Sequence, residues 1–101
     1  MNPNYVSEVA KAIRQEVPPS AMPDGDVDLL FLFYAVLAHT RGLATTGEDV
    51  HDAWTAWMTA VGEEHDSMVP FDELPAAVKE EDAPFVRAIR AVASKLSSTV
   101  R

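Results

Sequence analysis

Hydrophobic residues near the start of the chain recur every three or four positions, the spacing of one face of a helix. The recurring residues are Tyr5, Val6, Val9, Ile13 and Val17. This pattern predicts a first helix over about residues 3–16. Asn2 before Pro3 marks its start, because an asparagine side chain caps free amide groups and proline is tolerated in the first turn. The prolines and the Asp-Gly pair within residues 18–26 then predict a loop.

A continuous apolar run, LLFLFYAVLA at residues 29–38, follows this loop. We expect it to form a second helix that is capped by Asp26 or Asp28, ends near Thr40 and is apolar on nearly every side. Its ten residues are about half of what a membrane-spanning helix needs, so a buried central helix is the better interpretation. Gly42, which tolerates a left-handed backbone, marks its end.

Residues 46–62 contain the clearest amphipathic pattern. Thr46-Gly-Glu-Asp49 has the form of a capping box, with aspartate in place of the usual Glu or Gln. After it, one helical stripe is formed by Val50, Ala53, Trp54, Trp57, Met58 and Val61. A third helix is therefore predicted, and Gly62 ends it.

The stretch 63–74 (EEHDSMVPFDEL) has neither helical nor alternating periodicity, and it contains Pro70. We expect an ordered loop that carries its apolar side chains inward. These side chains are Met68, Val69, Phe71 and Leu74. A short helix is predicted over about residues 75–81, followed by a last helix that is capped by Asp82 and reaches about Leu96.

The predicted class is therefore all-α, with four main helices, one short helix and the Pro-containing loop 63–74. A chain of 101 residues that is 48% hydrophobic makes a single domain over residues 1–101. We divide it into an N-terminal helical hairpin (1–47) and a helix–loop–helix unit (48–101). The absence of cysteine excludes disulfides and thiolate sites, and the N-terminus contains no apolar signal segment, so a cytoplasmic location is expected.

The formal net charge of −8 argues against nucleic-acid and membrane partners. Residues 48–82 contain eleven acidic residues and one base, Lys79, whereas residues 83–101 contain four bases and no acid. Arg87 and Arg90 are three residues apart on the last helix, so both guanidinium groups face one side and suit an anion such as phosphate. The alternative is that these bases form weak surface pairs with the acidic segment.

Two separated motifs resemble the ryanodine-receptor repeat domain, the RyR domain. Val50-His-Asp-Ala-Trp54 is similar to the aliphatic-His-acid-x-Trp entry of that family. His65-Asp-Ser-Met-Val-Pro-Phe-Asp-Glu-Leu74 is similar to its His-Pro-x-Leu-Val-Pro-Tyr-Asp-Glu-Leu core, and Lys79-Glu-Glu-Asp82 resembles the Lys-Glu-x-Asp that follows. The resemblance covers about residues 50–96, and the connection 62–65 is shorter than in the receptor repeats.

This resemblance implies a module without catalytic activity that binds an adenine-type or signalling nucleotide. Trp54 is then the stacking residue, with Arg87 and Arg90 added from their charge as phosphate partners. The other candidate ligand-binding residues are Trp57, His51, His65, Phe71 and Asp72. Because the receptor repeats work in pairs, a homodimer is expected, and the family's context suggests a sensor or sponge in bacterial or phage conflict.

Each of these residues also has a structural interpretation. The tryptophans suit core positions, His51 and His65 suit hydrogen bonds to the backbone around Pro70, and Asp72 suits a helix cap. The adjacent His-Asp pairs are weak support for metal catalysis, because neighbours on a helix point in different directions, so no metal or cofactor is expected. The second candidate function is a protein–protein adaptor that uses the apolar second helix.

Overall fold

The computed structural model describes the backbone of residues 3–99 and the side chains of residues 3–97. Within these residues all regular structure is helical and no strand occurs, which confirms the all-α prediction. The elements in chain order are α1 (Tyr5–Glu16), η1 (Pro19–Ala21), α2 (Asp28–Thr40), η2 (Gly42–Ala44), α3 (Gly47–Ala60), η3 (Phe71–Glu73), α4 (Ala76–Glu80) and α5 (Ala83–Thr99).

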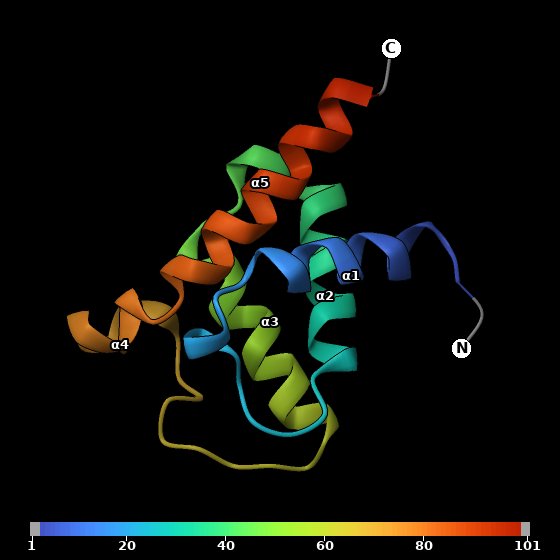
Figure 1. Cartoon of the computed structure of the whole chain (residues 1–101). Helices are drawn as coiled ribbons and strands as arrows, with labels where there is room; N and C mark the ends of the chain where they lie inside the picture. Colours follow the sequence, from blue (N-terminus) through green and yellow to red (C-terminus); the bar gives the residue numbers. More distant parts are fainter. Residues whose placement is uncertain (1–2, 100–101) are drawn as a thin grey trace.

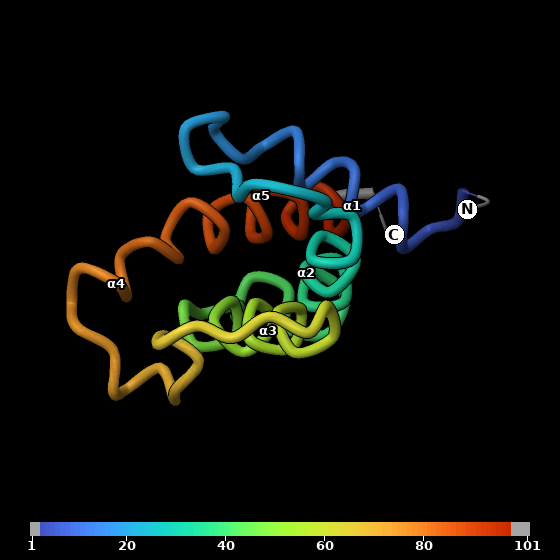
Figure 2. The backbone as a smooth tube through the Cα atoms, turned by 90° about the horizontal axis from the view of Figure 1, so that it is seen from below, coloured from blue at the N-terminus to red at the C-terminus, as the bar shows by residue number. Residues whose placement is uncertain are grey.

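The helices form two layers that α2 joins. Figure 1 shows α1 crossing α2, with α5 running diagonally past them and α4 standing apart at one end. In Figure 2, α5 and α1 lie in one layer, α3 and the loop that follows it lie in the other, and α2 closes one end between them. The opposite end, which contains α4 and the loop 61–75, is where the two layers diverge.

The core lies where α1, α2, α3 and α5 meet. Its most deeply buried side chains include Ile13, Leu30, Phe31, Tyr34 and Ile89, each no more than 1% exposed. Burying one such side chain contributes about 1.5–3 kcal/mol, so these contacts hold the layers together. The apolar second helix is therefore central, as predicted, and both the N-terminal hairpin and the C-terminal unit contribute to one core.

The start of α1 differs from the prediction. The helix begins at Tyr5, and its cap is Asn4, whose side chain accepts hydrogen bonds from the amides of Val6 and Ser7. Ser7 Oγ in turn accepts a bond from the Asn4 amide, so the pair forms a capping box. Asn2 was the predicted cap and lies outside the described residues. Periodicity located the helix, but the reciprocal Asn4–Ser7 pair decides where it starts.

The start of α2 is also different from either predicted alternative. Val27 occupies the cap position and no side chain caps the helix there, while Asp28 is the first helical residue. Asp26 contributes locally, because its Oδ1 accepts a hydrogen bond from the Asp28 amide at 3.0 Å. Asp28 instead pairs with Arg14 of α1 at 2.9 Å, an ion pair on the surface.

The predicted capping box of α3 is confirmed. Thr46 Oγ1 accepts from the Asp49 amide at 3.2 Å, and Asp49 Oδ2 accepts from the Thr46 amide at 2.9 Å. The helix is followed by Gly62, whose φ of 77° is a left-handed value that favours glycine. Gly42 after α2 has a φ of 57° and the same role.

The loop 63–74 is ordered, as predicted, and ends in the turn η3. Leu74 is buried in it, whereas Met68, Val69 and Phe71 are half-buried. The short helix α4 follows with Pro75 at its cap position and no side-chain cap. The structural interpretation of Asp72 as a cap of this helix is therefore wrong, because Pro75 already fixes a backbone angle suited to the start.

Over the part of the chain that the structure describes, no helix is both long enough and apolar enough to cross a lipid bilayer.

Candidate functional site

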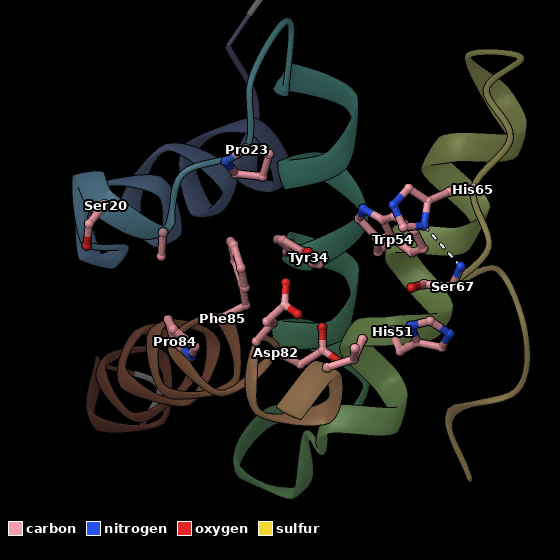
Figure 3. A pocket seen from close by; sticks show the side chains of 13 residues that line it. Ser20, Pro23, Tyr34, His51, Trp54, His65, Ser67, Asp82, Pro84 and Phe85 are labelled. Carbon is pink, nitrogen blue, oxygen red and sulfur yellow. Dashed lines mark hydrogen bonds between the residues drawn. The ribbon is translucent and has the colours of Figure 1, made fainter. Parts of the chain in front are cut away.

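A cleft of about 670 Å³ opens between the two layers at the end where α4 and the loop lie. Its lining comes from five segments of the chain, 20–23, 34, 51–54, 65–67 and 78–85. Figure 3 shows their side chains around the cleft. The lining residues are Ser20, Ala21, Pro23, Tyr34, His51, Trp54, His65, Ser67, Val78, Glu81, Asp82, Pro84 and Phe85. This volume is typical of pockets that bind small molecules.

One wall of the cleft is made of aromatic rings. The indole of Trp54 is half-buried and stacks on the imidazole of His51, with ring centres 5.7 Å apart and planes 25° apart. The imidazole of His65 makes a T-shaped contact with the same indole, with ring centres 5.5 Å apart and planes 86° apart. The structure thus brings together three residues that the sequence proposed as ligand contacts, and it places them on one side of a cleft (Figure 3).

Hydrogen bonds to the backbone hold these two imidazoles in place. His51 is 4% exposed, and its Nε2–H donates to the carbonyl of Val69 at 2.6 Å. His65 Nδ1 accepts from the amide of Ser67 at 3.0 Å. The predicted hydrogen bond of His51 to the backbone beside Pro70 is confirmed, and it joins α3 to the loop 63–74. Each bond also leaves the second ring nitrogen available for another partner.

The opposite side of the cleft carries an unpartnered carboxylate. Asp82 directly precedes α5, and its Oδ2 is buried without any hydrogen-bond partner. Burial raises the pKa of Asp82 to about 6; Glu81 acts in the same direction, and His51 opposes it. Sequence analysis assigned Asp82 to the cap of the last helix, but its Oδ2 does not bond to that helix. In Figure 3 the carboxylate points into the middle of the cleft.

Tyr34 and Phe85 form the base of the cleft. Both rings belong to the core, and their centres are 5.5 Å apart. Burial, and after it the charge of Asp82, raises the pKa of the Tyr34 phenol well above its usual value. The phenol therefore stays protonated and serves as a neutral polar group at the bottom of the cleft.

The structure does not bring the remaining predicted site residues to the cleft. Trp57 is 8% exposed and belongs to the core, and Asp72 is exposed on η3. Phe71 packs against His51 at 6.2 Å and lies under Lys79, outside the lining. Arg90 donates to the carbonyl of Thr45 at 2.9 Å, and Arg87 is exposed on α5.

Five polar residues of the lining were not predicted from the sequence: Ser20, Tyr34, Ser67, Glu81 and Asp82. Tyr34 is the one hydroxyl group in the apolar run 29–38, which was a usable signal for a polar atom at the edge of the core. Asp82 and Glu81 belong to an acidic stretch and gave no signal of their own. Among the described residues, no group of three or more His, Cys, Asp or Glu is arranged to hold a metal ion.

A family model for a domain of unknown function, DUF7701, matches residues 4–94. The matched range contains the buried core and every residue that lines the cleft. No curated protein and no solved structure matches the chain.

The predicted RyR assignment is wrong, because the family that matches is DUF7701, and its match also covers the N-terminal helices. The structure gives a physical reason for the similar motifs. Val50 and Ala53 are core positions of α3, and His51 ties that helix to Val69 of the loop. A helix docked on a Pro-containing loop uses these residue types for packing and hydrogen bonding. The nucleotide clamp, the homodimer and the role in bacterial or phage conflict lose the support that they drew from that resemblance.

Proposed function

The chain belongs to the DUF7701 family, and we propose that it is a non-enzymatic binding module that takes a small molecule in the cleft beside Trp54. The ligand carries a flat, nitrogen-containing ring, of which adenine is the type. The single observation that supports this proposal is the juxtaposition of a half-buried indole with a buried, unpartnered carboxylate oxygen in one cleft.

The aromatic wall supports the binding of a ring. Stacking of a base on an aromatic side chain contributes about 1–3 kcal/mol and requires a ring face that ligands can reach. The His51 imidazole is stacked on Trp54 and is fixed by Val69, so the wall is held in position before a ligand arrives. Such preorganisation lowers the entropy cost of binding.

The polar groups of the cleft support recognition of the edge of a ligand ring. Asp82 Oδ2 accepts hydrogen bonds, and a buried acceptor without a partner is costly to the protein alone. A ring amino group placed there would supply the missing donor. The phosphate part of the earlier hypothesis has less support, since Arg87 and Arg90 do not line the cleft.

The test is a thermal-shift panel of adenine, adenosine, AMP, ATP, ADP-ribose, NAD and cyclic nucleotides. A ligand at a hundredfold excess over its Kd stabilises a folded protein by about 2.7 kcal/mol. For a domain of this size, that corresponds to a rise in Tm of about 10 °C or more.

The matched variants are Trp54→Leu, which keeps an apolar side chain but removes the aromatic face, and Asp72→Asn, which changes an exposed residue outside the cleft. The proposal expects the shift to disappear in the first variant and to remain in the second. A ligand that shifts the Tm of Trp54→Leu as strongly as that of the wild type would remove Trp54 from the site. A flat response to the whole panel would contradict the proposal.

The second candidate function, a protein–protein adaptor, has one observation in its favour. Leu29 and Val36, on one face of α2, are 37% and 47% exposed, with Leu32 and Phe33 half-buried between them. Binding of an apolar dye to the folded protein that Val36→Ser abolishes would favour this candidate. The homodimer stays a prediction, which sizing of the purified chain tests.

A further inference from the structure

The charges at the cleft are of one sign. Glu81 and Asp82 bring two carboxyl groups to it, and the described residues that line it include no lysine or arginine. Of the bases nearest in the sequence, Lys79 lies over the ring of Phe71, Arg90 is bonded to Thr45, and Arg87 is exposed on α5 outside the lining. The net charge of −8 adds to the same field.

The other titratable groups at the cleft do little to reverse this sign. His65 Nδ1 accepts a hydrogen bond from the Ser67 amide, so this nitrogen is already occupied. Tyr34 stays protonated and neutral, because burial raises the pKa of its phenol. His51 opposes the two carboxyl groups, because it acts to lower the pKa of Asp82, and its Nε2–H donates to the Val69 carbonyl. Two carboxyl groups therefore dominate the local field.

The buried oxygen of Asp82 marks the position in the cleft where a positively charged group of a ligand would bind. Asp82 Oδ2 has no hydrogen-bond partner, although buried polar atoms in folded proteins nearly always have one. A charged donor makes a shorter and stronger bond to a carboxylate than a neutral donor does. The side chain points into the cleft (Figure 3), so such a donor can come from a bound molecule.

The aromatic rings fit the same class of ligand. Trp54, Tyr34 and Phe85 all line the cleft, and the faces of aromatic rings attract cations. Tryptophan is the most effective of these rings in attracting a cation. The rings and the carboxylates thus both attract a positively charged group, and the carboxylates repel a phosphate.

We propose that the ligand of this cleft is an organic cation, whose amidinium, guanidinium or ammonium group is bound by Asp82 while its flat part lies against Trp54. The inference rests on the proposed function, to which it adds the charge class of the ligand. It assigns to Asp82 the role of charge recognition, which sequence analysis did not assign to any acidic residue.

The test uses three probes that share one ring and differ in charge: benzamidine, which is protonated at neutral pH, neutral benzamide and anionic benzoate. The readout is the indole N–H signal of Trp54 in a two-dimensional NMR titration of the full chain. The signal of Trp57, which is buried in the core, serves as the internal reference. Trp57→Phe assigns the two signals.

We expect benzamidine to shift the Trp54 signal with a Kd at least about tenfold lower than that of benzamide, because a charged hydrogen bond is stronger than a neutral one. Benzoate should leave the signal unchanged. Asp82→Asn should remove the preference for benzamidine over benzamide. Asp72→Asn, which removes an exposed charge from the same acidic segment, should keep that preference and so excludes a long-range effect of net charge.

The outcomes separate the two proposals. Equal affinity for all three probes, tighter binding of benzoate, or a preference that survives in Asp82→Asn would overturn the cation inference and leave small-molecule binding in place. Binding of adenine or AMP at Trp54 without any response to benzamidine would do the same. If neither the probes nor the nucleotide panel moves the Trp54 signal, the proposed function fails together with the inference.

Discussion

The starts of α3 and α5 each involve an aspartate, and the two carboxyl groups have opposite surroundings. Asp49 accepts hydrogen bonds from the Thr46 amide and from Arg41 Nε, at 2.9 and 3.0 Å. Burial acts to raise the pKa of Asp49, but these bonds outweigh it and lower the pKa below its usual value. Asp82 has a buried oxygen with no partner, and burial raises its pKa to about 6.

This difference separates a carboxylate that stabilises the fold from one that is available to a ligand. Hydrogen bonds from Thr46 and Arg41 converge on Asp49 Oδ2, so this carboxylate stabilises the start of its own helix. Asp82 costs the folded protein free energy at neutral pH, because an ionised group is held in a partly buried position. Residues of the second kind are candidates for binding sites.

The largest effect is expected from His51→Ala, because His51 bonds α3 to the loop 63–74 and acts to lower the pKa of Asp82. The substitution leaves the Val69 carbonyl without its donor and removes the ring that packs on Trp54 and Phe71. We expect a loss of about 2–3 kcal/mol in the free energy of unfolding, measured by urea denaturation. Hydrogen exchange should also show faster opening of residues 63–74. Unchanged exchange in that loop would mean that His51 does not anchor it.

The second prediction concerns Asp49, the carboxylate that is hydrogen-bonded by Thr46 and Arg41. Asp49→Ala removes half of the capping box and the ion pair with Arg41, so the free energy of unfolding should fall by about 1–2 kcal/mol at pH 7. Because the folded pKa is lowered, the wild-type advantage is present above an unfolded pKa of about 4 and is lost as the pH falls through the folded value. Denaturation at pH 7 and pH 3 measures both. A difference that does not shrink at pH 3 would contradict this account.

The third prediction concerns Asp82, whose substitution should raise the free energy of unfolding at neutral pH. The folded pKa of Asp82 is raised, so its protonated form is favoured by folding and stability falls as the pH rises from about 4 to about 6. Asp82→Asn removes this penalty and should stabilise the protein at pH 7. After allowance for solvent screening of a half-buried group, we expect about 1 kcal/mol. Thermal denaturation should show nearly equal stability of the two proteins at pH 4. A variant that is less stable at pH 7 would show that Asp82 supports the fold.

The smallest effect concerns the last helix. Arg90→Ala removes the bond to the Thr45 carbonyl, which should cost less than about 1 kcal/mol in urea denaturation. Since Arg90 does not line the cleft, the affinity of any ligand detected at Trp54 should stay within about twofold of wild type, where a twofold change in Kd is about 0.4 kcal/mol. A tenfold loss of affinity for an anionic ligand would restore the phosphate hypothesis for this residue.

Much of the fold was predictable because local rules governed it. The apolar spacing of α3, the Thr46–Asp49 capping box and the glycine after the helix all act within a few residues, and the structure confirms them. The errors at the starts of α1 and α2 are also local. The reciprocal hydrogen bonds of Asn4 and Ser7 fix the start of α1, whereas no side chain caps α2 at Val27.

The candidate site was predictable in part. Trp54, His51 and His65 were singled out, because aromatic and imidazole groups near a loop are rare enough to notice. Phe71, Arg87 and Arg90 were singled out on the same chemical grounds, and the packing placed them outside the cleft. The family was assigned wrongly from two short motifs, because their residues also suit the packing of a helix on a loop.

The sequence by itself determined that the chain is all-α, that its second helix is central and that its C-terminal half is divided into an acidic and a basic segment. The tertiary structure alone decided that Tyr34, Trp54 and Asp82 meet at one cleft. The reason is that helical periodicity specifies which face of each helix is apolar. The angles between the packed helices decide which polar groups are buried without a hydrogen-bond partner at the end where the two layers diverge. Asp82 is such a group, and its unpartnered oxygen became visible only once α5 was placed against α2 and α3.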